Sequence, residues 1–138
     1  MYHQLEWNNR IGIFGTSRVG KSYLLKWIIR RYIRKNKRRY YILIDDKMSN
    51  VYELKKEGFH IQELDQEHLN KNYDYKKFLQ YHEKVAFVLN GFLTQKDIQK
   101  FINNLCRVIY NLGDSLFCVD EAHQFLPSGK HEPVNAVK

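Results

Sequence analysis

The chain has 138 residues, of which 43% are hydrophobic and 14% aromatic, and it carries a formal net charge of +8. That length suits a single domain over residues 1–138 with its own core, and that composition excludes an intrinsically disordered chain. No apolar run approaches the roughly 18 residues of a membrane span, and residues 1–9 contain no signal-peptide hydrophobic stretch. We therefore expect an intracellular protein without a membrane span.

The first predicted elements are a strand and a helix on either side of a glycine-containing motif. Residues 10–14, RIGIF, form a short apolar run of the strand type. Residues 23–33 carry apolar side chains at the spacing of one helical face. The residues of that expected face are Leu24, Leu25, Ile28, Ile29 and Ile33.

The segment between these two elements, GTSRVGKS, has the pattern G-x-x-x-x-G-K-S. Gly15 and Gly20 allow backbone angles and close approaches that a Cβ would forbid, so successive N–H groups can form an anion nest at a helix N-terminus. Lys21 is expected to reach the β- and γ-phosphates of a nucleotide, and the Ser22 hydroxyl to bind Mg²⁺. The alternative is a glycine turn followed by an accidental Lys-Ser pair. The expected nucleotide-binding residues are Gly15, Thr16, Ser17, Arg18, Val19, Gly20, Lys21 and Ser22.

A strongly basic run follows the first helix. Residues 1–39 hold eleven Lys and Arg against one acid, whereas residues 40–138 hold twelve against fourteen. Seven of the ten residues from Arg30 to Arg39 are basic, which exceeds what capping a helix C-terminus requires and suggests a polyanion nearby. The alternative is a solvated face. The expected DNA-binding residues are Arg30, Arg31, Arg34, Lys35, Lys37, Arg38 and Arg39.

The rest of the chain alternates between predicted strands and helices. Strands are expected at YYILIDD (residues 40–46), FHIQEL (59–64), KVAFVLNG (84–91) and SLFCV (115–119). Helices are expected over residues 48–57, which Gly58 ends, over 74–82, and over 94–112, where Thr94 is the N-cap and Gly113 the stop. This alternation predicts an α/β fold, with a mostly parallel sheet covered by helices on both faces.

Two adjacent acids close the last strand. Asp120 is expected at the carboxyl end of that strand, the edge of a parallel sheet at which the phosphate loop also lies. There it would help to hold Mg²⁺ together with Ser22, and Glu121 would orient and deprotonate a water aimed at the γ-phosphate. The alternative is an acid-rich turn without a catalytic role.

FGTSRVGKS, YILIDDK and LFCVDEAHQFLP, in that order, resemble the HerA/FtsK superfamily of P-loop ATPases, which includes DNA translocases and viral genome-packaging ATPases. The resemblance covers Arg10 to Pro127 and includes Walker A and Walker B motifs. It implies a RecA-like P-loop NTPase core, ATP hydrolysis with Mg²⁺, and a ring, usually a hexamer, around duplex DNA. It also implies a cytoplasmic location, in the host cytoplasm if the chain is viral.

The same resemblance assigns roles to single residues. Lys21 and Ser22 match the phosphate and Mg²⁺ contacts, with Lys21 counted among the catalytic residues, and Asp120 and Glu121 match the Mg²⁺-side acid and the catalytic base. The stretch Asp45-Asp46-Lys47 stands where relatives often carry Asp-Pro-Lys or Asp-Pro-His, and here it lacks the proline. Relatives continue into another strand with a polar sensor and arginines. We therefore expect a chain truncated at its C-terminus, with the slot between the Asp120 strand and residues 10–14 left for that strand. The alternatives are that another segment fills this slot or that the two strands pair directly.

Other residues and other functions compete with this assignment. Arg18 and Arg107 are arginines of unassigned role, and Cys106 and Cys118 are expected to be reduced, buried small hydrophobes. The tyrosines that could stack on bases, although core packing is the commoner use, are Tyr40, Tyr41, Tyr73, Tyr75 and Tyr81. Alternative functions are a nucleotide-dependent switch or binding module with little hydrolysis, a superfamily 2 helicase fragment, and a small-molecule kinase.

Overall fold

The computed structural model of the chain describes residues 20–45, 47–69, 73–89 and 93–120. The predicted strand over residues 10–14 and everything after Asp120 lie outside these ranges. No helix of the described part is long and apolar enough to cross a bilayer.

Four parallel strands form a single sheet in the described part of the chain. They are β1 (Tyr40–Asp45), β2 (His60–Leu64), β3 (Lys84–Leu89) and β4 (Ser115–Val119), in the order β2-β3-β1-β4. β1 pairs with both β3 and β4, so this first described strand is internal, while β2 and β4 are the outer strands. The parallel pairing confirms the α/β fold class that the alternation of elements predicts.

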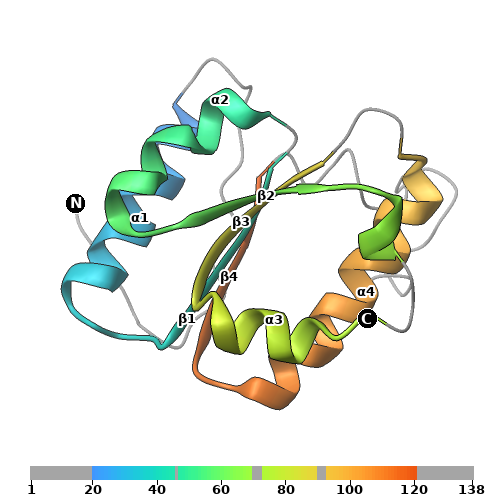
Figure 1. Cartoon of the computed structure of the whole chain (residues 1–138). Helices are drawn as coiled ribbons and strands as arrows, with labels where there is room; N and C mark the ends of the chain where they lie inside the picture. Colours follow the sequence, from blue (N-terminus) through green and yellow to red (C-terminus); the bar gives the residue numbers. More distant parts are fainter. Residues whose placement is uncertain (1–19, 46, 70–72, 90–92, 121–138) are drawn as a thin grey trace, which may run out of the picture.

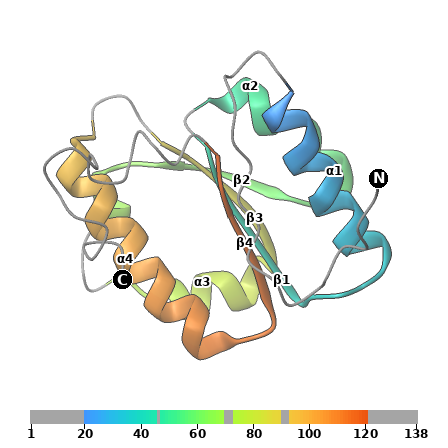
Figure 2. The same ribbon diagram turned by 180° about the vertical axis from the view of Figure 1, so that it is seen from behind.

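Helices cover both faces of the sheet (Figures 1 and 2). α1 (Lys21–Arg34) and α2 (Met48–Val51) lie against one face, and α3 (Tyr75–Tyr81) and α4 (Gln95–Leu112) lie against the other. The helix predicted up to Gly58 is α-helical only in its first part, because α2 continues as the 3₁₀ helix η2 (Tyr52–Glu57). A second 3₁₀ helix, η3 (Gln66–Leu69), follows β2.

The strand residues point alternately into two apolar cores. Tyr41, Leu43 and Cys118 pack with Ile28, Ile29 and Tyr32 of α1 on one face. On the other face, the buried residues of β1 and β3 pack with those of α3 and α4. They are Tyr40, Ile42, Ile44, Val85, Phe87, Leu89, Tyr75, Leu79, Ile98, Phe101, Ile102 and Leu105. A strand that is buried on both faces needs apolar residues at every position, which explains the continuous run YYILI.

The ends of the helices follow the chemistry expected of them. The Thr94 hydroxyl accepts the Asp97 N–H at 3.1 Å and Asp74 accepts the Lys77 N–H at 3.0 Å, so both helices have side-chain N-caps. Gly58 ends η2 with φ of 90°, in the left-handed region that favours glycine. The predicted start of α4 and the predicted stop at Gly58 are thus confirmed.

The structure corrects two expectations about individual side chains, on α1 and at Cys106, and decides between the two uses considered for the tyrosines. Leu24 is exposed, and Tyr32, absent from the predicted α1 face, is only 1% exposed and belongs to the core. Cys106 lies on the outer side of α4 and is exposed, while Cys118 is buried as expected. Tyr40, Tyr41 and Tyr75 are buried, so packing rather than base stacking occupies these rings, whereas Tyr81 is exposed.

Candidate functional site

Two buried aspartates lie side by side at the carboxyl edge of the sheet. Asp45 ends β1 and is 1% exposed, and Asp120 directly follows β4 and is 7% exposed. Ile44 is in register with Val119, and the Asp120 N–H donates to the Ile44 carbonyl oxygen at 2.9 Å. The next positions along these two neighbouring strands are the two aspartates. The sheet therefore brings together a residue of the middle motif and a residue of the last motif.

The backbone after β1 turns at Asp45. The Asp45 Oδ1 accepts the Lys47 N–H at 3.1 Å, which is the local side-chain-to-backbone turn that aspartate favours. A carboxylate this deeply buried is costly unless its oxygens are satisfied by donors or cations. Asp45 is thus a structural turn residue whose burial also suits an oxygen ligand.

Cys118 lies under this edge, one strand position before Val119. Burial, together with the nearby Asp120 carboxylate, raises the pKa of the Cys118 thiol to about 12. The thiol is therefore protonated at neutral pH, which makes it a small core hydrophobe and not a nucleophile.

The start of α1 completes the carboxyl edge. Gly20 precedes the helix with φ of 83° and ψ of 21°, a left-handed conformation in which a side chain would be strained. Its carbonyl oxygen accepts the Leu24 N–H at 2.9 Å, so the helix begins immediately after it. α1 has no side-chain N-cap and no acid in its first turn. These are conditions under which the first-turn N–H groups suit an anion.

The direction of α1 places this helix start at the same edge of the sheet as the two aspartates. Figures 1 and 2 show α1 running opposite to β1, so its Gly20 end lies at the edge where β1 and β4 end. The backbone of Lys21 and Ser22 forms the first turn of α1. The other expected site residues lie outside the described ranges: Gly15, Thr16, Ser17, Arg18, Val19 and Glu121.

The basic run divides into engaged and exposed side chains. Arg30 pairs with Glu57 at 3.2 Å and approaches Glu53 at 3.8 Å, and Arg39 pairs with Glu83 at 2.6 Å. Part of the positive charge of the basic run is therefore paired with carboxylates of the chain itself. Arg31, Arg34 and Lys35 are exposed, while Lys37 and Arg38 are partly buried.

The end of the basic run lies at the amino edge of the sheet, opposite the aspartates. A hollow of about 440 Å³ there is lined by Arg38, Arg39, Glu83, Lys84 and Asp114, among others. Both cations and carboxylates line it, so it presents no single sign of charge. Any polyanion held by this run would lie far from Asp45 and Asp120.

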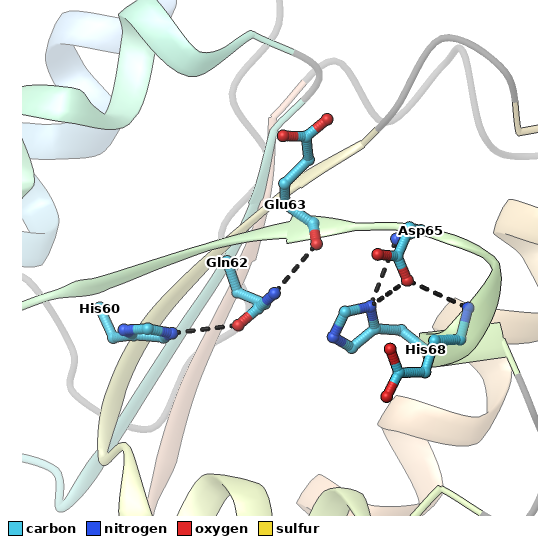
Figure 3. Close-up of polar contacts among 6 residues, drawn as sticks. His60, Gln62, Glu63, Asp65 and His68 are labelled. Atoms are coloured by element: carbon cyan, nitrogen blue, oxygen red, sulfur yellow. Dashed lines mark hydrogen bonds and ion pairs between the residues drawn. The ribbon is translucent and has the colours of Figure 1, made fainter.

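A second polar group lies on the outer strand β2, two strands from β1 (Figure 3). Asp65 follows β2, as Asp45 ends β1, and its Oδ1 accepts the Glu67 N–H at 3.0 Å. Nδ1 of the buried His68 lies 2.9 Å from the same oxygen. Figure 3 shows the His68 side chain pointing back towards Asp65. The contacts of Asp65 therefore stabilise the start of η3, and this group is separate from the Asp45–Asp120 pair.

Comparison of the chain with protein-family models, with curated proteins and with solved structures finds no match. The case for a function therefore depends on the motifs and on the geometry of the carboxyl edge. Sequence reasoning noted Asp45 only as part of a motif without its proline. The sequence showed that both strands are followed by acids at the carboxyl edge, but the adjacency of the two strands comes from the structure.

Proposed function

We propose that the chain is a P-loop ATPase that hydrolyses ATP with Mg²⁺ and couples hydrolysis to the movement of DNA. The observation that carries the proposal is the buried pair Asp45 and Asp120 at the edge where α1 begins with Gly20-Lys21-Ser22. Acids at the carboxyl ends of neighbouring parallel strands, next to a helix N-terminus that follows a GxxxxGKS sequence, are what a magnesium nucleotide requires.

The residues at this edge fit a magnesium nucleotide in two respects. Two carboxylates buried at adjacent strand ends offer oxygen atoms, the ligand type that Mg²⁺ prefers. The uncapped start of α1 offers N–H groups and a positive dipole end to phosphate oxygens. Groups that suit Mg²⁺ and groups that suit phosphate would thus lie at one edge of the sheet.

The proposed roles follow from the chemistry of each side chain. The loop from Gly15 to Ser22 would wrap the phosphates with its backbone N–H groups, and Lys21 would add a positive charge on the β- and γ-phosphates. The Ser22 hydroxyl and Asp120 would hold Mg²⁺, with Asp45 beside them. Bound Mg²⁺ supplies positive charge on the phosphate oxygens. Glu121 would accept the proton of the attacking water.

DNA movement and assembly are the further parts of the proposal. A RecA-like core that assembles as a ring, usually of six copies, around duplex DNA is implied by the resemblance to the HerA/FtsK superfamily. The exposed cations Arg31, Arg34 and Lys35 support a contact with phosphates. They extend from the end of α1, so DNA held there would be moved by the helix whose other end holds the nucleotide.

The decisive experiment is the ATP turnover rate of the purified chain with and without duplex DNA, with Lys21→Ala as the matched inactive variant. Turnover that DNA stimulates and that Lys21→Ala abolishes is the expected result. Nucleotide binding with negligible turnover under both conditions would indicate a switch instead. Phosphoryl transfer to a small molecule without any effect of DNA would indicate a kinase.

A further inference from the structure

One side of α1 carries exposed aromatic rings next to exposed cations. We call Tyr23, Trp27, Arg31 and Arg34 the α1 stripe. Tyr23 is 73% exposed and Trp27 is 45% exposed, and both arginines are exposed. Rings of this size are normally placed in cores or at interfaces. Unlike singly exposed rings, two rings in a row beside two cations form a continuous surface that could bind a partner.

The stripe follows from the helical period and is separate from the surfaces that α1 uses within the fold. Tyr23, Trp27 and Arg31 are four residues apart, so they lie one above another on the same side of the helix. Ile28, Ile29 and Tyr32 form the buried side. A third side faces η2, through Lys26 to Glu53 at 2.8 Å and Arg30 to Glu57 at 3.2 Å.

The chemistry of the stripe is that of flat rings combined with positive charge. The Arg31 guanidinium lies 5.2 Å from the centre of the Trp27 ring, a cation–π contact that orients both side chains. α1 contains no Asp or Glu between Lys21 and Arg34. A partner for this surface must therefore bring negative charge together with flat apolar faces.

From this complementarity we propose that the α1 stripe binds an unpaired stretch of nucleic acid. Bases would stack on Trp27 and Tyr23, while Arg31 and Arg34 contact the phosphates, as in single-strand binding surfaces in general. A duplex satisfies the charges but keeps its bases stacked on one another, so it leaves the rings unused. The biological role of this site in a DNA motor rests on the proposed function, but the binding itself requires no ATP.

The position of the stripe suggests a use. Tyr23 follows Ser22 directly, and the stripe runs about 17 Å along α1 from Tyr23 to Arg34, at about 1.5 Å per residue, towards the amino edge of the sheet. A strand bound along it would touch the same helix whose first turn belongs to the candidate nucleotide site. Displacement of α1 on nucleotide binding would thus act directly on the bound strand.

The test uses the intrinsic fluorescence of Trp27. The chain has two tryptophans, so Trp7→Phe leaves Trp27 as the only one. This protein is titrated, without nucleotide, with a thymidine oligonucleotide, a uridine oligonucleotide and a DNA duplex of equal length. The single strands are expected to quench Trp27, because a stacked base alters the ring's surroundings. The comparison of thymidine with uridine shows whether DNA or RNA is preferred.

Variants then assign the contact to the stripe. In the parent chain, Trp27→Ala should weaken single-strand affinity about tenfold, and Arg31→Ala should reduce the magnitude of the salt slope by about 0.7. The matched control is Tyr110→Ala, on α4, where a still more exposed ring (86%) carries no proposed role. Thermal unfolding followed by circular dichroism checks that each variant is folded. The quenching experiment uses only Trp7→Phe, so it does not depend on the alanine variants.

Several outcomes would overturn the proposal. One is a lack of Trp27 quenching by single strands. Another is an equal effect of Trp27→Ala and Tyr110→Ala on single-strand affinity. A third is that Trp27→Ala lowers single-strand and duplex affinity equally. A change in sedimentation coefficient of Trp27→Ala without nucleic acid, at unchanged affinity, would make the stripe an interface between copies of the chain. Inactivity as an ATPase with normal quenching would refute the proposed function and leave the stripe standing.

Discussion

The Asp120 N–H donates to the Ile44 carbonyl oxygen at 2.9 Å, and this bond extends the pairing of β4 with β1 by one residue beyond the strand ends. Because the bond fixes the register, Asp120 lies next to Asp45 at the carboxyl edge. Both carboxylates are buried, although the residues are 75 positions apart in the sequence. Each prediction about nucleotide chemistry depends on this pair and on the helix that starts at the same edge of the sheet.

Removing one charge of the pair should weaken the binding of Mg²⁺. Asp45→Asn keeps an acceptor for the Lys47 N–H, so the turn is preserved while the negative charge is lost. We expect the Mg²⁺ concentration needed for half-maximal nucleotide binding to rise about tenfold or more, as for residues that support a metal ligand. Asp65→Asn is the control, because Asp65 occupies the equivalent turn after β2. Equal effects of both variants would separate Asp45 from the metal site.

Lys21→Ala should abolish tight nucleotide binding. The variant removes the charge that would lie on the β- and γ-phosphates, and it retains a residue with good helix propensity in the first turn of α1. Titration of a fluorescent ATP analogue into the parent and the variant measures the effect. Equal affinities, with both proteins folded, would show that the GKS motif does not hold phosphate.

Glu121→Gln should separate binding from hydrolysis. The amide keeps the shape of the side chain and loses its basicity, so ATP with Mg²⁺ should still bind. The hydrolysis rate should fall by about 10²–10⁴-fold, the contribution of a positioned base. Single-turnover hydrolysis measures the chemical step without product release. A rate within a few-fold of the parent would assign the base to another residue.

The sequence predicted the positions of the helices and strands better than it predicted which strands are adjacent in the sheet. Apolar runs bounded by glycine or acids located all four described strands, and the Thr94 cap with the Gly113 stop bounded α4. Connectivity alone does not determine the order of strands in a parallel sheet. The adjacency of β1 and β4, and with it the Asp45–Asp120 pair, therefore had to come from the structure.

The side chains of α1 show the same limit. Leu24 and Tyr32 both fit a helical apolar stripe at its margins, and hydropathy favoured the leucine. In the fold, Tyr32 packs under the sheet and its carbonyl oxygen accepts the Tyr41 hydroxyl at 3.1 Å, which ties the end of α1 to β1. Periodicity gave the phase of the helix only to within about one residue.

Neutralising the end of the basic run should weaken DNA binding without affecting the nucleotide site. Lys35→Gln, Lys37→Gln, Arg38→Gln and Arg39→Gln together remove cations at the amino edge, opposite Asp45 and Asp120. We expect lower duplex affinity and a flatter dependence on salt, by about one unit of slope per lost phosphate contact, with unchanged affinity for ATP. Arg39 pairs with Glu83, so its own share should be the smallest. An unchanged salt slope would identify the run as a solvated face.

The final prediction concerns pH and the stacked rings of His60 and His82. Their ring centroids are 3.9 Å apart and their planes 10° apart, beside Phe78, with His60 at the start of β2 and His82 directly after α3. Burial, with a smaller effect of His60, lowers the pKa of His82 in the folded state. The unfolded chain therefore binds a proton at this position more readily than the folded chain. The contribution of neutral His82 to the free energy of unfolding is present above the unfolded pKa of about 6.5, and it is lost as pH falls through the folded value. We expect the melting temperature to decline below about pH 6.5, and His82→Phe, which keeps a stacked ring without a proton site, to flatten that decline. Thermal unfolding from pH 8 to pH 5 measures both, and equal slopes for the parent and the variant would remove His82 as the cause.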